Sequence, residues 1–292
     1  MASRLRVGMI GTGFGSLVQI PAFRAHARAE VVAVASGTPG KAKKTADALG
    51  VPHEQRIYLR GRAYATDPTY VAEHRDLTRS AAMQHASRTA LQQGGITIDD
   101  VAHLDLYSCF ASSLHFAQDA LGLTPNATRA LTVTGGLPYH GGPGSGYLTH
   151  SIATMVDRLR AEPGSFGMVS GVGMHMTKHV FGVYSSIPGA LAREPGTPSS
   201  TPEREVAITV TYDGRATVCA YSVVHGRDGA PEWGLLVCDL PDGSRAYAKL
   251  LDADELAAAE RIELVGRAVQ LSTTTANGAM GEQSVNVARL TD

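Results

Sequence analysis

Cysteine, charged residues and long apolar runs are all scarce in this chain of 292 residues. Its three cysteines are odd in number and form no CxxC pair, which argues against a disulfide framework and a zinc knuckle. No run of about 18 apolar residues occurs, so we expect no membrane span. The N-terminus meets glycine at once and lacks the apolar core of a signal peptide. With 43% hydrophobic and 18% charged residues, we expect a folded protein in the reducing cytoplasm and no bound metal.

Charge is distributed unevenly along the chain, although the net charge is only −1. Residues 1–53 carry a net charge of +5, residues 54–200 are neutral and residues 201–292 carry −6. Such asymmetry indicates separate structural units. A stretch rich in proline, glycine, serine and threonine precedes the acidic part and is typical of a linker. We therefore predict four parts: residues 1–53, residues 54–190, a linker at residues 191–202 and residues 203–292.

The first part has the pattern of a strand–helix–strand unit. Apolar strands are expected at residues 5–10 and 30–35, and the turn between them contains Gly11, Gly13 and Gly15. Such a turn lets a diphosphate approach the backbone at a helix N-terminus, which makes NAD(P) a candidate cofactor. Serine stands where the dinucleotide pattern has its last glycine, and a glycine-rich turn without a ligand explains the sequence equally well.

The motifs VGMIGTGFGS, IPAFRAH and EVVAVAS of this part resemble the N-terminus of the Gfo/Idh/MocA oxidoreductases. The resemblance implies an NAD(P)-binding fragment in residues 1–53, joined near residue 53 as in a gene fusion. The family's Glu-Lys-Pro motif with its catalytic lysine occurs nowhere in the chain. The acid that binds the ribose is replaced by Ser36, and the nearby Lys41, Lys43 and Lys44 suit a 2′-phosphate instead.

The second part alternates strands with helices, which indicates a layered α/β unit. Helical spacing of apolar residues predicts helices at residues 79–93, 110–121 and 147–161. Strands are expected at residues 101–107, 166–172 and 180–185.

Chemistry-bearing residues gather in the loops of this second part. Six glycines in residues 135–146 leave many N–H groups unobstructed by side chains, as an oxyanion hole requires. His140 and His175 are candidate acid/base groups, and Cys109 opens a helix, where a thiol pKa falls. Each also has a structural explanation, as a surface or core histidine or a buried packing cysteine. Metal binding by His175 and His179 would need a helix that the neighbouring glycines disfavour.

Residues 58–184 resemble the C-terminal half of thiolase-superfamily acyltransferases, nearest the sterol-carrier-protein-type thiolases. The motifs that carry the resemblance are YLRGRAYATDP, AEHRDLTRSAAM, LDLYSCFASSLHFAQDALG, TVTGGLPYHGGPGSGYLTHSIA and GVGMHMTKHVFGVYS. The resemblance implies half of a duplicated thiolase fold. It also implies acyl-CoA as substrate, so that acyl transfer needs no further cofactor, and a homo- or hetero-oligomer with a thiolase-like subunit.

The family's catalytic residues are largely replaced in this sequence. By the resemblance, Gly142 stands at the catalytic histidine, Gly171 at the second cysteine and Tyr107 at the asparagine position. Gly173 could keep its role as an oxyanion donor, and His140 or His175 could act as surrogate acid/base. The nucleophilic cysteine belongs to the other half of the fold, and residues 1–53 contain no cysteine. The resemblance therefore predicts a catalytically incomplete acyltransferase, because a thiolase holds its acyl group on that thiolate.

The third part is expected to be all-β. Strands are predicted at residues 206–211, 216–224, 234–240, 246–251 and 262–269, with a helix at residues 254–260. Three Asp-Gly turns favour tight hairpins between them. Five strands and one helix predict an OB-like barrel. The net charge of −6 argues against nucleic acid, so we expect an interaction module.

Three functions remain open at this point. The first is an incomplete thiolase-like acyltransferase that binds acyl-CoA, and the second is an NAD(P)-binding oxidoreductase fragment. The third is a non-catalytic scaffold that docks onto a complete thiolase.

Overall fold

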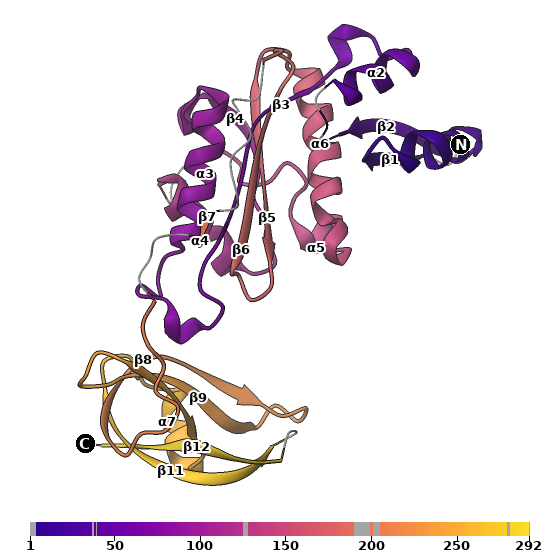
Figure 1. Ribbon diagram of the computed structural model, residues 1–292. Coiled ribbons are helices and arrows are strands. Elements are labelled where there is room, and N and C mark those ends of the chain that lie inside the picture. The colour runs from indigo at the N-terminus through magenta and orange to yellow at the C-terminus, as the bar shows by residue number, and fades with distance from the viewer. Residues whose placement is uncertain are drawn as a thin grey trace. The chain divides into compact units, whose positions relative to one another are not determined.

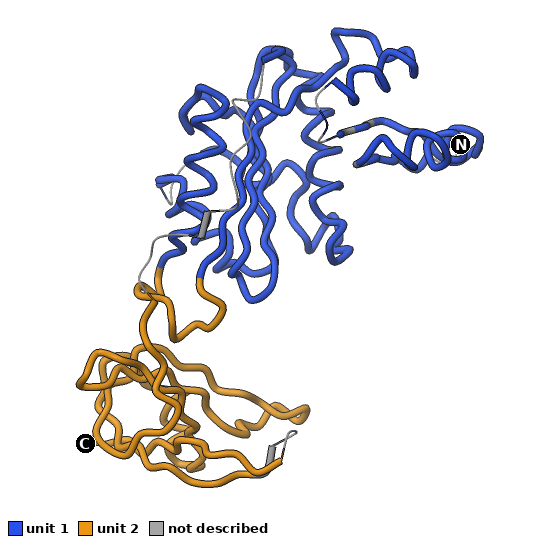
Figure 2. Tube along the Cα trace, viewed as in Figure 1, with its two compact units in different colours: residues 1–67, 79–201 blue, residues 68–78, 202–292 orange. Residues whose placement is uncertain are grey.

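The computed structural model describes residues 4–36, 38, 40–124, 128–189, 199–200, 205–278 and 281–291. The chain forms two compact units, coloured separately in Figure 2. Unit 1 comprises residues 1–67 and 79–201, and unit 2 comprises residues 68–78 and 202–292. The predicted linker at residues 191–202 lies, apart from residues 199–200, outside the described residues.

Unit 1 begins with the expected strand–helix–strand arrangement. Strand β1 (Leu5–Ile10) pairs in parallel with β2 (Ala29–Ala35) in a two-stranded sheet. Between them a π-helical turn, η1 (Gly15–Gln19), runs into α1 (Ile20–Ala25), and α2 (Lys41–Ala48) follows β2. The helix that follows the glycine-rich turn is thus short and irregular at its start.

The main sheet of unit 1 has five strands in the order β4-β5-β6-β3-β7. Strand β4 (Val101–Asp105) is parallel to β5 (Phe166–Gly173), whereas β6 (Lys178–Ser185) is antiparallel to both β5 and β3 (Tyr58–Thr66). The short β7 (Ser199–Ser200) pairs in parallel with β3. Figure 1 shows α3 (Ala81–Gly94) and α4 (Ala111–Leu121) on one face and α6 (Tyr147–Ala161) on the other.

Local sequence explains where these helices begin and end. The Ser80 hydroxyl accepts a hydrogen bond from the Met83 N–H and so caps α3. Gly95 and Gly122 adopt left-handed φ angles of +67° and +68° and terminate α3 and α4. The apolar faces then pack on the sheet, with Met83 and Leu104 on one side and Met155 on the other. The helices predicted at 79–93, 110–121 and 147–161 are therefore confirmed to within two residues at their ends.

Unit 2 contains a closed five-stranded barrel in the order β10-β12-β11-β8-β9. Its strands are β8 (Gly214–His225), β9 (Pro231–Asp239), β10 (Arg245–Leu250), β11 (Ala268–Gly278) and β12 (Gly281–Leu290), with α7 (Ala253–Ala259) after β10. Neighbouring strands are antiparallel except β10 and β12. Gly229 and Gly243, with φ angles of +82° and +81°, form the predicted Asp-Gly hairpin turns.

Two of the predicted barrel strands are wrong. Residues 206–211 form only an isolated bridge at Ile208, because side-chain and backbone bonds pin this segment as an irregular stretch beside β10. Most of residues 262–269 form a turn, in which Gly266 has a φ of +85° and the buried Leu264 fills the core. Strands β11 and β12 take their places, and their many serine, threonine, asparagine and glutamine residues conceal them from an apolar pattern.

Among the described residues, no helix combines the length and the apolar character that a membrane crossing would require.

Candidate functional site

A buried carboxylate, Asp105, organises the loops at the end of β4. Its side chain is fully buried. The Thr134 backbone N–H and hydroxyl donate to Asp105 Oδ1 at 3.0 and 2.7 Å, and the Tyr147 hydroxyl donates to Oδ2 at 3.1 Å. Asp105 therefore holds both ends of the glycine-rich segment of residues 134–146 against β4. Sequence reasoning missed this residue, although an acid that ends a buried strand was a signal for it.

The middle of the glycine-rich segment is attached to the loop that follows β4. The Leu137 N–H donates to Ser108 Oγ at 3.0 Å, at the start of α5 (Leu137–His140). Gly136 has a φ of +88°, and a Cβ there would lie 2.8 Å from Ser108 Oγ. Only glycine fits at this position. Any other residue would be strained at this positive φ, and its Cβ would clash with Ser108 Oγ.

Tyr107 lies beside the end of the glycine-rich segment, in contact with Tyr147. Its ring packs edge-on against Tyr147 with 5.1 Å between centroids, and its N–H donates to Ser170 Oγ of β5 at 2.9 Å. Burial and the neighbouring Cys109 raise the pKa of the Tyr107 hydroxyl, so it is a proton donor rather than a base at neutral pH. Cys109 is a partly exposed free thiol in the same loop.

His140 is brought together with a second histidine, His150 of α6. Their rings meet edge to face with centroids 5.3 Å apart. His140 is exposed, whereas the Nδ1 atom of His150 is buried and has no hydrogen-bond partner among the described residues. The pair places two imidazoles beside the glycine-rich segment, where a proton could be exchanged.

His175 occupies a different position, on the turn between β5 and β6. The turn is strained, with positive φ angles of 56° at Met174 and 59° at Met176. His175 is exposed, and within the described part of the chain no hydrogen bond or ring contact joins it to His140 or Tyr107. Gly173 ends β5, and its carbonyl accepts a bond from the Thr177 N–H at 3.3 Å.

A buried polar cluster of Asp67, Ser80 and His179 fixes that turn. His179 Nε2 lies 3.0 Å from Asp67 Oδ2, 3.2 Å from Ser80 Oγ and 2.9 Å from the Met176 carbonyl. Ser80 Oγ donates to Asp67 Oδ2 at 2.5 Å, and the Ala82 N–H donates to Oδ1 at 2.9 Å. Burial disfavours the charge of Asp67, but the bonds from His179, Ser80 and Ala82 outweigh it and lower the pKa of this carboxyl.

Two cavities lie in the N-terminal part of unit 1. One, of about 410 Å³, is lined by Thr12 and Ser16 of the glycine-rich turn and by Lys41 and Lys44. Ser16 Oγ donates to the carbonyls of Thr12 and Gly13. The serine that replaces the expected glycine therefore forms hydrogen bonds within the turn.

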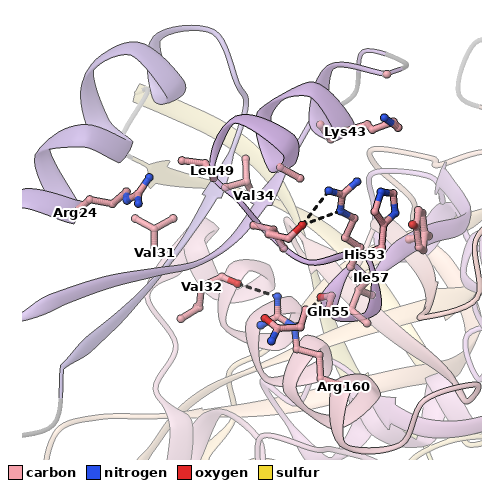
Figure 3. A pocket seen from close by; sticks show the side chains of 16 residues that line it. Arg24, Val31, Val32, Val34, Lys43, Leu49, His53, Gln55, Ile57 and Arg160 are labelled. Atoms are coloured by element: carbon pink, nitrogen blue, oxygen red, sulfur yellow. Dashed lines mark hydrogen bonds between the residues drawn. The ribbon is translucent and has the colours of Figure 1, made fainter.

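The other cavity, of about 430 Å³, is drawn in Figure 3. Valines of β2 form its apolar wall, and Arg160 of α6 reaches into it and donates to the Val32 carbonyl at 3.4 Å. Burial lowers the pKa of the Arg160 guanidinium, which nonetheless stays a cation at neutral pH. Within the described ranges, no group of three or more histidine, cysteine or acidic residues is placed to hold a metal ion.

Comparison with known proteins agrees with this architecture. A crystal structure of a monomeric SCP2-thiolase like protein type 1 from Mycobacterium smegmatis is similar at 34% identity with a TM-score of 0.74. The likeness covers 86% of this chain and 54% of that one. Residues 198–275 match the family described as the thiolase-like protein type 1 additional C-terminal domain. The fold is thiolase-like.

The peroxisomal 3-ketoacyl-CoA thiolase of Saccharomyces cerevisiae is a more distant match, at 16% identity and a TM-score of 0.38. That match covers 49% of this chain and 37% of the yeast one. No curated protein sequence matches the chain. The match covers 54% of the mycobacterial relative, so this thiolase-like chain spans about half of that protein's length. The resemblance of residues 1–53 to the Gfo/Idh/MocA oxidoreductases stays a prediction, as do the bounds of the four predicted parts.

Proposed function

We propose that this chain binds acyl-CoA thioesters at the glycine-rich segment of residues 134–146 and does not turn them over by itself. The observation that carries the proposal is the attachment of this segment to β4 through Asp105 and Ser108, which fixes a loop in which the Gly135 and Gly142 N–H groups have no acceptor among the described residues. Fixed N–H groups around glycines stabilise the negative charge that develops on a thioester oxygen. His140 and His150 supply the acid/base groups beside it.

The same proposal explains why turnover is not expected. A thiolase cycle needs a thiolate that carries the acyl group between two steps. Two of the chain's cysteines are not suited to this role, because burial raises the pKa of Cys219 to about 11 and of Cys238 to about 12. Cys109 remains, on the loop after β4, and we propose that it lines the site without forming an acyl intermediate.

The expected result is binding without reaction. Calorimetric titration with acetyl-CoA should give a saturable isotherm, and acetoacetyl-CoA with free CoA should show no thiolysis. Gly136→Ala should abolish the isotherm because its Cβ meets Ser108 Oγ at 2.8 Å. Gly8→Ala is the matched control, since Gly8 lies in β1, outside this segment, and its Cβ would meet nothing within 4 Å.

Three results would contradict the proposal. They are no isotherm with the unaltered chain, robust thiolysis by the purified chain, and an acyl adduct trapped on Cys109 and identified by mass spectrometry. We also propose that the exposed Phe110 and Tyr139, beside this site, mark a face for a thiolase-like partner subunit. Turnover that appears only when a cysteine-containing subunit is added fits this proposal.

A second candidate function is NAD(P) binding by residues 1–53. The cavity beside Thr12 and Ser16 favours it, because Lys41 and Lys44 offer two cations to a phosphate. NADPH should then show a saturable rise in fluorescence anisotropy. Gly13→Asp should abolish the rise, since Lys41 Nζ lies 4.0 Å from the position of the new Cβ and would be neutralised. Gly8→Ala, which meets no atom within 4 Å, is the control. If the anisotropy of NADPH does not rise when protein and cofactor are each present at about 1 mM, this candidate function is excluded.

A further inference from the structure

Unit 2 has a cavity of its own, of about 520 Å³, on the outer surface of the barrel. Its floor is formed by Trp233 and Leu235 of β9, Tyr247 and Lys249 of β10 and Val285 of β12. The segment around Val210 and the turn around Tyr70 border it. Its volume is within the range of sites for small organic ligands.

The walls of this cavity are fixed by buried polar side chains. Asn286 is 3% exposed and accepts from the Tyr212 N–H while donating to the carbonyls of Val210 and Tyr247. The Ala72 N–H donates to the Tyr247 hydroxyl at 3.0 Å. Arg245, which is paired with Asp239, donates to the carbonyls of Ala72, His74 and Arg75. Both borders are therefore held in place before any ligand arrives.

Most of the side chains that line this cavity are aromatic or apolar, and Lys249 is the cation among them. The Lys249 ammonium lies 5.1 Å from the centre of the Trp233 ring. No carboxylate forms an ion pair with Lys249 in the part of the chain that the structure describes. The acid that lines the cavity, Glu73, accepts a hydrogen bond from the Tyr70 N–H at 2.9 Å. Leu235, 37% exposed, lies opposite Lys249 in the ladder and continues the apolar surface.

We propose that this cavity is a binding site for a small ligand with a flat aromatic ring and an anionic group. The ring would stack on Trp233, and the carboxylate or phosphate would take the place of water on Lys249. A polynucleotide does not fit, because Lys249 is the only lysine or arginine among the described residues that line the cavity, and residues 201–292 carry a net charge of −6. The ligand class is shared by aryl carboxylates and purine mononucleotides, which the experiment must separate.

The experiment uses the full chain and the fact that Trp233 is its only tryptophan. The single indole N–H resonance in a ¹H–¹⁵N spectrum then reports on this cavity alone. We would titrate 2-naphthoate, AMP and the neutral 2-naphthalenemethanol separately. A saturable shift is expected with at least one of the two anions, and a Kd about tenfold weaker for the neutral alcohol. A shift with 2-naphthoate alone assigns the aryl carboxylates, and a shift with AMP alone assigns the mononucleotides.

Variants keep the test specific. Lys249→Gln should weaken the anion about tenfold and leave the alcohol unchanged. Leu235→Asp should also weaken the anion, by setting a carboxylate opposite Lys249. Arg261→Gln, an exposed cation of the same unit outside this cavity, is the control and should bind like the unaltered chain. An indole resonance that neither 2-naphthoate nor AMP moves at about 5 mM, or equal affinities in Lys249→Gln and the unaltered chain, overturns the proposal.

Discussion

Asp67→Ala is expected to lower the free energy of unfolding of unit 1 by about 3–5 kcal/mol, because it breaks a buried charged cluster. The carboxylate accepts bonds from His179, Ser80 and the Ala82 N–H, all in a fully enclosed position. Alanine would leave the buried Ala82 N–H without an acceptor and would remove one hydrogen-bond partner each from His179 and Ser80, and such losses are costly in a buried site. The loss should also loosen the turn that carries His175, since His179 binds the Met176 carbonyl.

Hydrogen exchange followed by mass spectrometry is the appropriate measurement, because the chain has two units and its tryptophan is in the other one. Peptides from β3, α3 and β6 should exchange faster in Asp67→Ala, and barrel peptides should not change. Asp99→Ala removes an exposed acid of the same unit and should behave like the unaltered chain. Equal protection from exchange in Asp67→Ala and Asp99→Ala would show that the cluster contributes nothing to the stability of unit 1.

The same carboxylate makes stability depend on pH in a defined direction. The pKa of Asp67 is lower in the folded chain than its ordinary value of about 3.9. The contribution of the Asp67 carboxylate to the free energy of unfolding is therefore complete above its ordinary pKa. It is lost as the pH falls through the pKa in the folded chain. Asp67→Asn keeps the shape but cannot ionise. The stability difference between it and the unaltered chain should be constant near neutral pH and shrink below about pH 4.

Gly61→Ala is expected to destabilise unit 1 by about 3 kcal/mol or more, because α3 crosses β3 directly over this residue. A Cβ at Gly61 would overlap the carbonyl oxygen of Ala90 and would lie 3.1 Å from the Gly94 nitrogen. These are backbone atoms of a helix, so no side chain can rotate to make room. Gly61 also follows an irregularity in the pairing of β3 with β6.

Urea unfolding monitored by far-UV circular dichroism, together with exchange of the β3 and α3 peptides, measures this effect. Gly8→Ala is the matched control, since Gly8 is also in a strand of unit 1 and its Cβ would meet nothing within 4 Å. A change below about 1 kcal/mol in Gly61→Ala would mean that the helix can move away from the strand at little cost.

Local patterns determined much of this fold. The helix at residues 147–161 could be placed from its apolar spacing, and the hairpin turns at Gly229 and Gly243 from Asp-Gly pairs. These features depend on neighbours a few residues apart, so the sequence itself carries their cause. The glycine-rich segment was likewise visible as a candidate site from its composition, whereas Tyr107 was a candidate only through the family resemblance.

Only the tertiary structure decided which of those candidates meet. Asp105 joins Thr134 and Tyr147 across 29 and 42 positions of sequence, and no local pattern encodes such a contact. His140 meets His150, whereas His175 stays on a separate turn, because strand order and loop attachment set those distances. Strands β11 and β12 were missed for a related reason. Their pairing with each other satisfies the backbone of a polar sequence, and such long-range hydrogen bonds leave no periodic apolar signal.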